Sequence, residues 1–142
     1  LLHEIKINTK DYDILSQTKL PDIIKSDKDI YYYELKRNIP SFITKLITTG
    51  QIIHLKKNMN YDLLKNNIVA IENADPGYDF IFSYNIKGLI TKYGGSNSHM
   101  AIRCQENNIP AIIGSGEIDF ENIIQKKTIQ IDCKNNTYKT IF

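Results

Sequence analysis

From residue 39 onward, short apolar runs rich in isoleucine alternate with polar segments that contain Gly, Asn, Asp or Pro. Runs of this length, bounded in this way, are typical of β-strands. Asn135 and Asn136 separate the last two runs and predict a hairpin turn, because asparagine tolerates positive φ. We therefore expect strands at residues 41–44, 50–56, 68–72, 88–91, 111–113, 128–132 and 138–141.

Between these strands lie segments whose apolar residues recur at helical spacing. We expect helices at residues 79–84, 98–107 and 117–124. Short helices interleaved with strands predict an α/β domain, in which the helix after residue 98 crosses between two strands.

Residues 1–37 have a different texture, because charged residues and turn formers alternate there with short apolar pieces such as IIK and IYYYEL. We interpret this segment as an N-terminal arm or linker, and residues 38–142 as the main domain. An arm that folds independently is the alternative. The chain begins without methionine, which suggests a piece of a longer polypeptide.

Composition and charge exclude some partners. The chain has 142 residues, a hydrophobic fraction of 42% and a formal charge of +2, with acidic and basic residues scattered along it. No basic stripe suits nucleic acid or an anionic membrane, and no apolar run or signal peptide predicts a membrane span. Cys104 and Cys133 lack metal-binding spacing, so we expect buried free thiols and, with them, a reducing cytoplasm.

The segment TKYGGSNSHMAIRCQENNIPAIIG, residues 91–114, combines several features that favour anion binding. Gly94 and Gly95 permit backbone turns that other residues avoid, and the exposed amides of such turns form an anion-binding concavity. Ser98 is a good helix N-cap, which places His99 in the first turn of the helix that follows. Free amides and the positive end of the helix dipole at this position attract phosphate.

Metal binding and nucleophilic hydrolysis are less suited to His99. No second histidine or carboxylate follows it at helical spacing, and no G-x-S-x-G elbow or orienting carboxylate accompanies it. A neutral imidazole that accepts and passes on a phosphoryl group fits better. Ser96, Ser98 and Arg103, which lies one helical turn after His99, would then hold the phosphate. Glu106 either orients Arg103 or is merely exposed.

The other polar residues that stand out in the sequence are expected to have structural roles. His3 and His54 lack a supporting motif and are interpreted as surface or strand residues. Asp75-Pro76-Gly77 predicts a turn, which could also line a docking face. Glu72 and Asp79 could bind a metal, but we prefer a strand end and a solvated helix start.

The stretch GGSNSHMAIRCQENNIPAIIGSG resembles the phosphohistidine motif of the PEP-utilising enzyme mobile domain, the swivelling domain of PEP synthases, pyruvate phosphate dikinases and related phosphotransferases. A looser resemblance extends over residues 42–141 and implies a swivelling β/β/α domain with a central mixed sheet flanked by short helices. The matching positions are Gly94, Gly95, Ser98, His99, Ala101, Ile102, Glu106, Ile109, Pro110, Ala111 and Gly114.

The resemblance implies a carrier that is one domain of an ATP-dependent phosphotransferase. An ATP-grasp-like domain of the same polypeptide, with Mg²⁺, would phosphorylate Nε2 of His99, and an acceptor-binding domain would receive the group. The acceptor could be pyruvate, an antibiotic hydroxyl or an amide, and the ADPGYDFIF segment resembles a branch that serves a kinase-like enzyme. The domain itself would bind no cofactor, and the isolated chain would not turn over. Gln105 departs from the family pattern, which has arginine there, whereas this chain has Arg103.

Two other interpretations of the domain remain open. A swivel or docking module that has lost phosphorylation would explain Gln105, although the loop and His99 are intact. A hydrolase that uses His99 as a base ranks last, because the sequence offers neither a framed nucleophile nor an orienting acid.

Overall fold

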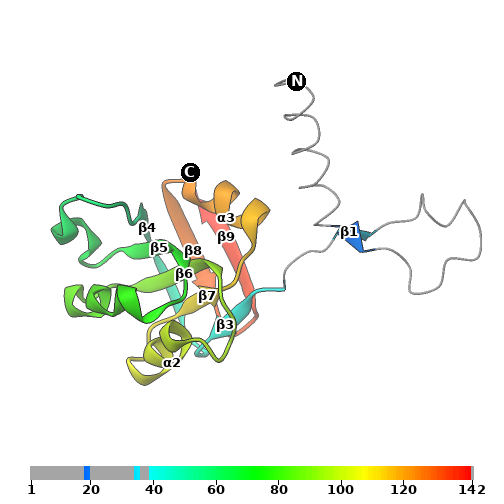
Figure 1. Ribbon diagram of the computed structural model, residues 1–142, viewed down its shortest axis with the longest axis horizontal. Coiled ribbons are helices and arrows are strands. Elements are labelled where there is room, and N and C mark those ends of the chain that lie inside the picture. The colour runs from blue at the N-terminus through cyan, green and yellow to red at the C-terminus, as the bar shows by residue number, and fades with distance from the viewer. Residues whose placement is uncertain (1–17, 20–33, 36–38, 142) are drawn as a thin grey trace, which may run out of the picture. The chain divides into compact units, whose positions relative to one another are not determined.

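The computed structural model describes residues 18–19, 34–35 and 39–141 (Figure 1). The chain divides into two units, Leu1–Arg37 and Asn38–Phe142. In the first, strand β1 (Thr18–Lys19) pairs antiparallel with β2 (Glu34–Leu35). The rest of the expected arm or linker at 1–37, with His3, lies outside the described residues.

The second unit is built on one curled mixed sheet of seven strands (Figure 1). Its order is β3-β7-β6-β5-β4-β8-β9, with parallel pairing from β4 through β5 and β6 to β7 and antiparallel pairing at both edges. This mixed sheet confirms the predicted α/β fold class. The strands are β3 (Ser41–Ile43), β4 (Ile47–His54), β5 (Ile68–Asn73), β6 (Gly88–Tyr93), β7 (Ala111–Ile113), β8 (Thr128–Asp132) and β9 (Thr137–Ile141).

Four short helical elements connect these strands. The predicted helices at 98–107 and 117–124 are α2 (His99–Glu106) and α3 (Glu117–Ile124). The helix predicted at 79–84 is instead a 3₁₀ helix, η3 (Pro76–Tyr84), which begins three residues earlier because Asp75 caps the amide of Gly77 at 2.8 Å. A further 3₁₀ turn, η2 (Tyr61–Leu64), was not predicted.

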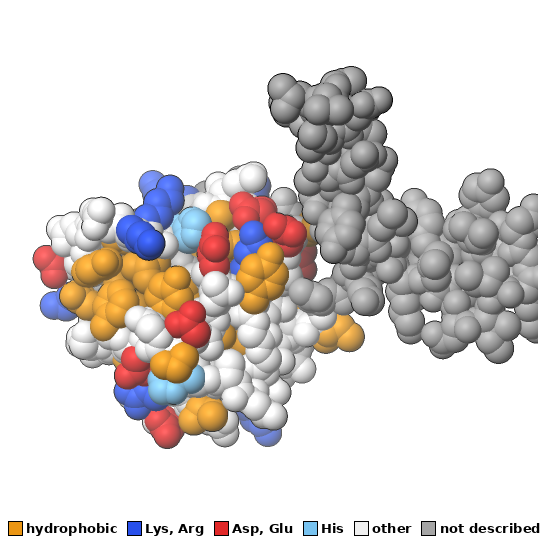
Figure 2. Space-filling model, viewed as in Figure 1, with side chains coloured by type: hydrophobic (Ala, Val, Ile, Leu, Met, Phe, Trp, Pro, Cys, Tyr) orange, Lys and Arg blue, Asp and Glu red, His pale blue; other side chains and the backbone are white. Residues whose placement is uncertain are grey.

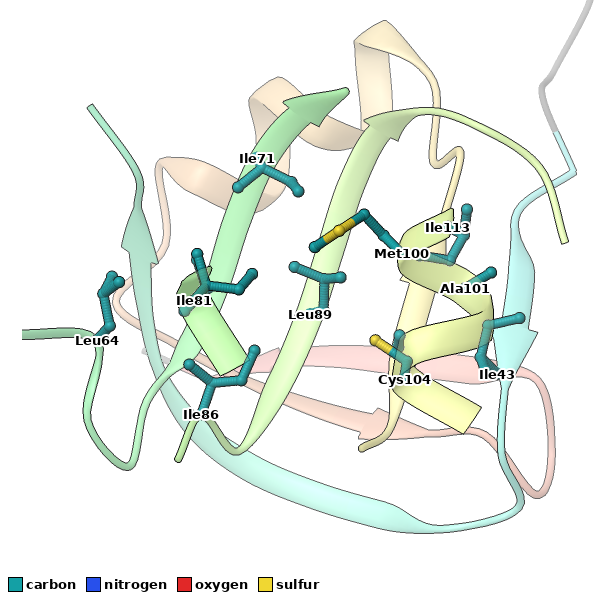
Figure 3. Packing of buried hydrophobic residues seen from close by; sticks show 12 residues of the cluster. Ile43, Leu64, Ile71, Ile81, Ile86, Leu89, Met100, Ala101, Cys104 and Ile113 are labelled. Carbon is teal, nitrogen blue, oxygen red and sulfur yellow. The ribbon is translucent and has the colours of Figure 1, made fainter. Parts of the chain in front are cut away.

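Both faces of the sheet are buried, and successive residues of one strand point to opposite faces. In β5, Val69 and Ile71 join a core with α2, η2 and η3, whereas Ile68 and Ala70 join a core with α3 and β8. Figure 3 shows side chains of α2 directed toward the central strands in the first of these cores. Both helices α2 and α3 are therefore fixed to the central strands, one on each face.

Both cysteines are buried and not joined in a disulfide, as predicted. Burial raises the pKa of Cys104 to about 12, so this thiol stays protonated and unreactive near neutral pH. None of the helices formed by the described residues has the length and apolar character needed to cross a membrane.

Candidate functional site

The pairing of β5 with β6 determines which loops meet at the site. The two strands run parallel, with Ile71 opposite Thr91 and Asn73 opposite Tyr93. The segments that follow them, residues 74–84 and 94–106, therefore leave the sheet at the same edge. One segment carries η3 and the other carries the glycine loop and α2, so this register brings η3 and α2 into contact.

Gly94, the first glycine of the loop, is required by the local packing. Its φ is +131°, and a Cβ at this position would lie 2.5 Å from the Cβ of Ala74. Gly114, at the end of β7, has φ +71°, and a Cβ there would collide with the carbonyl oxygen of Gly94. Because these two glycines lack side chains, the segments that contain Ala74, Gly94 and Gly114 can pack closely against one another beside the site.

Gly95 differs from its neighbour, because a Cβ at this position would meet no atom within 4 Å. Its backbone is not in the positive-φ region either. Its carbonyl accepts a hydrogen bond from the amide of Ser98 at 3.0 Å, which turns the loop into α2. Gly95 thus leaves open space beside the backbone just before α2, and a ligand can approach the backbone there.

His99 is the first residue of α2, as the sequence predicted. The hydroxyl of Ser98 accepts a hydrogen bond from the amide of Ala101 at 3.4 Å, which confirms Ser98 as the N-cap. The first amides of a helix have no partner within it and carry the positive end of its dipole. The side chain of His99 is 39% exposed, so the ring at this end of the helix remains open to solvent.

Asp79, in η3, is the direct partner of the histidine ring. Its Oδ1 lies 2.9 Å from Nε2 of His99, across 20 residues of sequence. Hydrogen bonds from His99 and Arg103 hold the pKa of this carboxyl below its ordinary value of 3.8. Asp79 is therefore ionised near neutral pH and can only accept, so Nε2 is the atom that carries the proton.

Arg103 connects Asp79 to α2. Its Nε donates to the same Oδ1 of Asp79 at 2.9 Å, and its Nη1 donates to Oε2 of Glu106 at 3.0 Å. Its guanidinium carbon lies 5.5 Å from the centroid of the Phe82 ring. Of the two alternatives for Glu106, the structure shows the pairing with Arg103. The guanidinium thus contacts two carboxylates and an aromatic face.

Asp79 lies in the first turn of η3 with its side chain 44% exposed, which agrees with the solvated helix start that we preferred. It also contacts two side chains of α2, which the sequence did not predict. The statement that His99 lacks an orienting carboxylate is therefore wrong. The serine hydrolase interpretation still lacks a nucleophile, because His99 has no hydrogen bond to a hydroxyl or thiol within residues 39–141.

The remaining predicted residues have ordinary surroundings. Ser96 is exposed in the loop, and Glu72 is exposed near the end of β5, as expected. His54 ends β4 and packs edge-on against Phe120, with ring centroids 5.7 Å apart, so it is the strand residue that we predicted. Asp75 forms the expected turn by capping η3.

The surface of the domain carries charges of both signs in small separate groups (Figure 2). Orange side chains gather over the part of the domain that includes η2 and η3, where Leu63 and Phe80 are 53% and 40% exposed. On this face the charges do not form a continuous basic surface of the kind that binds nucleic acid.

Comparison with known proteins identifies relatives with the same kind of domain. Residues 63–136, more than half of the chain, match the family described as PEP-utilising enzyme, mobile domain. Rifampicin phosphotransferase of Bacillus subtilis is 30% identical over 131 residues, and the enzyme of the same name from Bacillus cereus is 28% identical over 131 residues. Each alignment covers 80% of this chain and 15% of the relative, so the chain spans a small part of these proteins.

Proposed function

The chain belongs to the family of PEP-utilising enzyme mobile domains, and on this premise we propose that it carries a phosphoryl group on His99 between two sites of a multidomain phosphotransferase. The observation that carries the proposal is the position of His99. His99 is the first residue of α2 and its side chain is half-exposed, at the helix end where the first amides lack intrahelical partners and four residues after the open position of Gly95. An incoming phosphoryl group would meet hydrogen-bond donors and a favourable dipole there.

The residues of this chain divide the work of the transfer. The ring of His99 first changes tautomer: Nε2 releases its proton to water and Nδ1 takes up a proton from water, so that Nε2 presents its lone pair. That pair forms the N–P bond, while the bond from phosphorus to the bridging oxygen of the donor breaks and its electrons leave with the donor. The loop amides after Gly94, the hydroxyls of Ser96 and Ser98, and Arg103 are available to hold the phosphoryl oxygens.

The donor and the acceptor would bind to other domains. We propose that ATP and Mg²⁺ are bound by an ATP-grasp-like domain, and that a third domain presents the acceptor. The two Bacillus relatives are named as rifampicin phosphotransferases, which supports a small-molecule acceptor such as an antibiotic. Attachment to one polypeptide would give the carrier a high effective concentration at both sites.

The test is to label the complete phosphotransferase that carries this domain with ATP bearing ³²P at the β or the γ position. We expect an acid-labile, base-stable label that is absent from His99→Ala and unchanged in the matched variant His54→Ala. If only one of the two labelled nucleotides labels His99, the position of its ³²P shows which phosphate of ATP is transferred. A protein that stays unlabelled with both nucleotides would contradict the carrier and favour a docking module that has lost phosphorylation.

A further inference from the structure

We propose that Asp79 is a positioning residue that competes with the phosphoryl group for Nε2 of His99 and for Arg103, and thereby keeps the phosphohistidine short-lived and ready to donate. This inference rests on the proposed function. It gives Asp79 a role in the second half of the cycle, in which His99 loses the phosphoryl group. The sequence alone did not predict this role.

The competition follows from where the carboxylate lies. Oδ1 of Asp79 is 2.9 Å from Nε2 of His99, in the place that a phosphorus atom bonded to Nε2 would need. The same oxygen accepts from Nε of Arg103 at 2.9 Å. A phosphoryl group on Nε2 must therefore displace Asp79 from the ring, and it shares the positive charge of Arg103 with Asp79.

Charge makes the phosphorylated site less stable. The carboxylate carries one negative charge and the phosphoryl group close to two, and because Asp79 belongs to η3, beside α2, it remains near a group that repels it. The side chains of His99 and Asp79 are 39% and 44% exposed, so water reduces this repulsion without removing it. Among the described residues, the charged side chains in contact with the pair are Arg103 of α2 and, behind it, Glu106.

The carboxylate also favours cleavage of the N–P bond. In hydrolysis the oxygen of water attacks phosphorus, the N–P bond breaks with its electrons on Nε2, and a ring that is protonated on Nδ1 leaves as neutral imidazole. A negative charge beside the ring favours that protonated form. Repulsion and ring protonation thus act in the same direction, and both shorten the life of the phosphohistidine.

The experiment phosphorylates the full chain directly with phosphoramidate, which needs no nucleotide-binding domain, and follows the decay of the phosphohistidine by ³¹P NMR between pH 5 and 9. His99→Ala supplies the background from the other histidines. We expect Asp79→Asn to lengthen the half-life at pH 7 roughly five- to tenfold, the effect of one unit charge at about 4 Å in water. The pH below which the half-life falls should also shift downward, a change that a purely structural role for Asp79 would not produce.

Asp75→Asn is the matched control, because it makes the same substitution in the cap of the same helix and asparagine caps equally well. We expect its half-life to equal that of the wild type.

Arg103→Gln should act in the opposite direction and shorten the half-life, which keeps the proposal testable if Asp79→Asn does not fold. A half-life in folded Asp79→Asn that is equal to or shorter than that of the wild type would overturn the inference, even if ATP labels His99 in the complete enzyme. Failure of ATP labelling alone would contradict only the proposed function.

Discussion

At the scale of single residues, the two adjacent glycines of the loop have different reasons to lack a side chain. Gly94 has φ +131° and packs against Ala74, so alanine there adds both backbone strain and a collision. We expect Gly94→Ala to lower the free energy of unfolding by about 1–3 kcal/mol, measured by urea denaturation.

Gly95→Ala is the matched variant. A Cβ at this position meets nothing within 4 Å, and φ is not positive, so we expect a free energy of unfolding within about 0.5 kcal/mol of the wild type. If the open space at Gly95 admits the phosphoryl group, the same variant should nevertheless lose most of the ATP-dependent label on His99. Full labelling of Gly95→Ala would show that the space has no part in binding.

The sequence predicted the residues of the loop better than the partner of the histidine. Ser98, His99 and Arg103 could be placed together because capping and helical spacing are local rules. Asp79 lies 20 residues before His99, and no local rule connects them. The parallel pairing of β5 with β6 is the signal that could have found it, because segments that follow neighbouring parallel strands share one edge of the sheet.

At the scale of elements, a buried lysine attaches α3 to the strand that leads into the loop. Lys92 of β6 has a side chain only 10% exposed, and its Nζ lies 3.3 Å from Oε1 of Glu117 and 3.1 Å from Oε1 of Glu121. Burial alone would lower the pKa of Lys92, but the hydrogen bonds to the two glutamates outweigh it and raise the pKa above 10.5. The sequence did not predict this contact.

Removing the carboxylates should therefore cost more than removing the lysine. Glu117→Gln with Glu121→Gln leaves a buried ammonium without a counter-charge, and we expect a loss of about 1–2 kcal/mol in the free energy of unfolding. Lys92→Met removes the charge and keeps the volume, so it should stay closer to the wild type. Urea denaturation of both variants measures which loses more free energy of unfolding. A greater loss in Lys92→Met than in the double glutamine variant would contradict this account.

The pH dependence of this effect has a definite sign. Because the pKa of Lys92 is raised on folding, its pairing stabilises the fold fully below the ordinary pKa of 10.5. That contribution disappears as the pH rises through the folded pKa. The difference between the wild type and the double glutamine variant should thus be constant near neutral pH and shrink above pH 10.5.

The elements themselves were largely predictable. β7, β8 and α3 have the predicted bounds, because a polar or glycine residue marks a boundary of each: Gly114 follows β7, Asp132 ends β8 and Gly116 precedes α3. The start of β4 was missed, since Ile47 is 54% exposed and the stretch from Ile47 to Thr49 lacks a buried apolar run. That part of β4 is held by its pairing with β8, a long-range contact that local patterns do not contain.

At the scale of the whole molecule, the described core lies entirely between Ile43 and Cys133. The two clusters fill both faces of the sheet, and the site is attached to the edge of one of them through Met100, Ala101 and Cys104 of α2. A packed core with His99 at the surface of the described domain suits the carrier that we propose, because a carrier must present the same geometry at two different sites.

This division of labour predicts what the chain does by itself. We propose that the residues around His99 can hold a phosphoryl group in the purified chain, and that the groups that activate ATP belong to another domain. With ATP and Mg²⁺ alone, we expect neither steady ATP consumption nor a label on His99, whereas phosphoramidate should load His99 in the same preparation. The assay follows release of ADP, AMP and phosphate over hours, with His99→Ala as the control for contaminating enzymes. The opposite result would be ATP consumption that is present in the wild-type chain and absent from His99→Ala. It would mean that this domain activates ATP as well as accepting the phosphoryl group, so that the two tasks are not divided between domains.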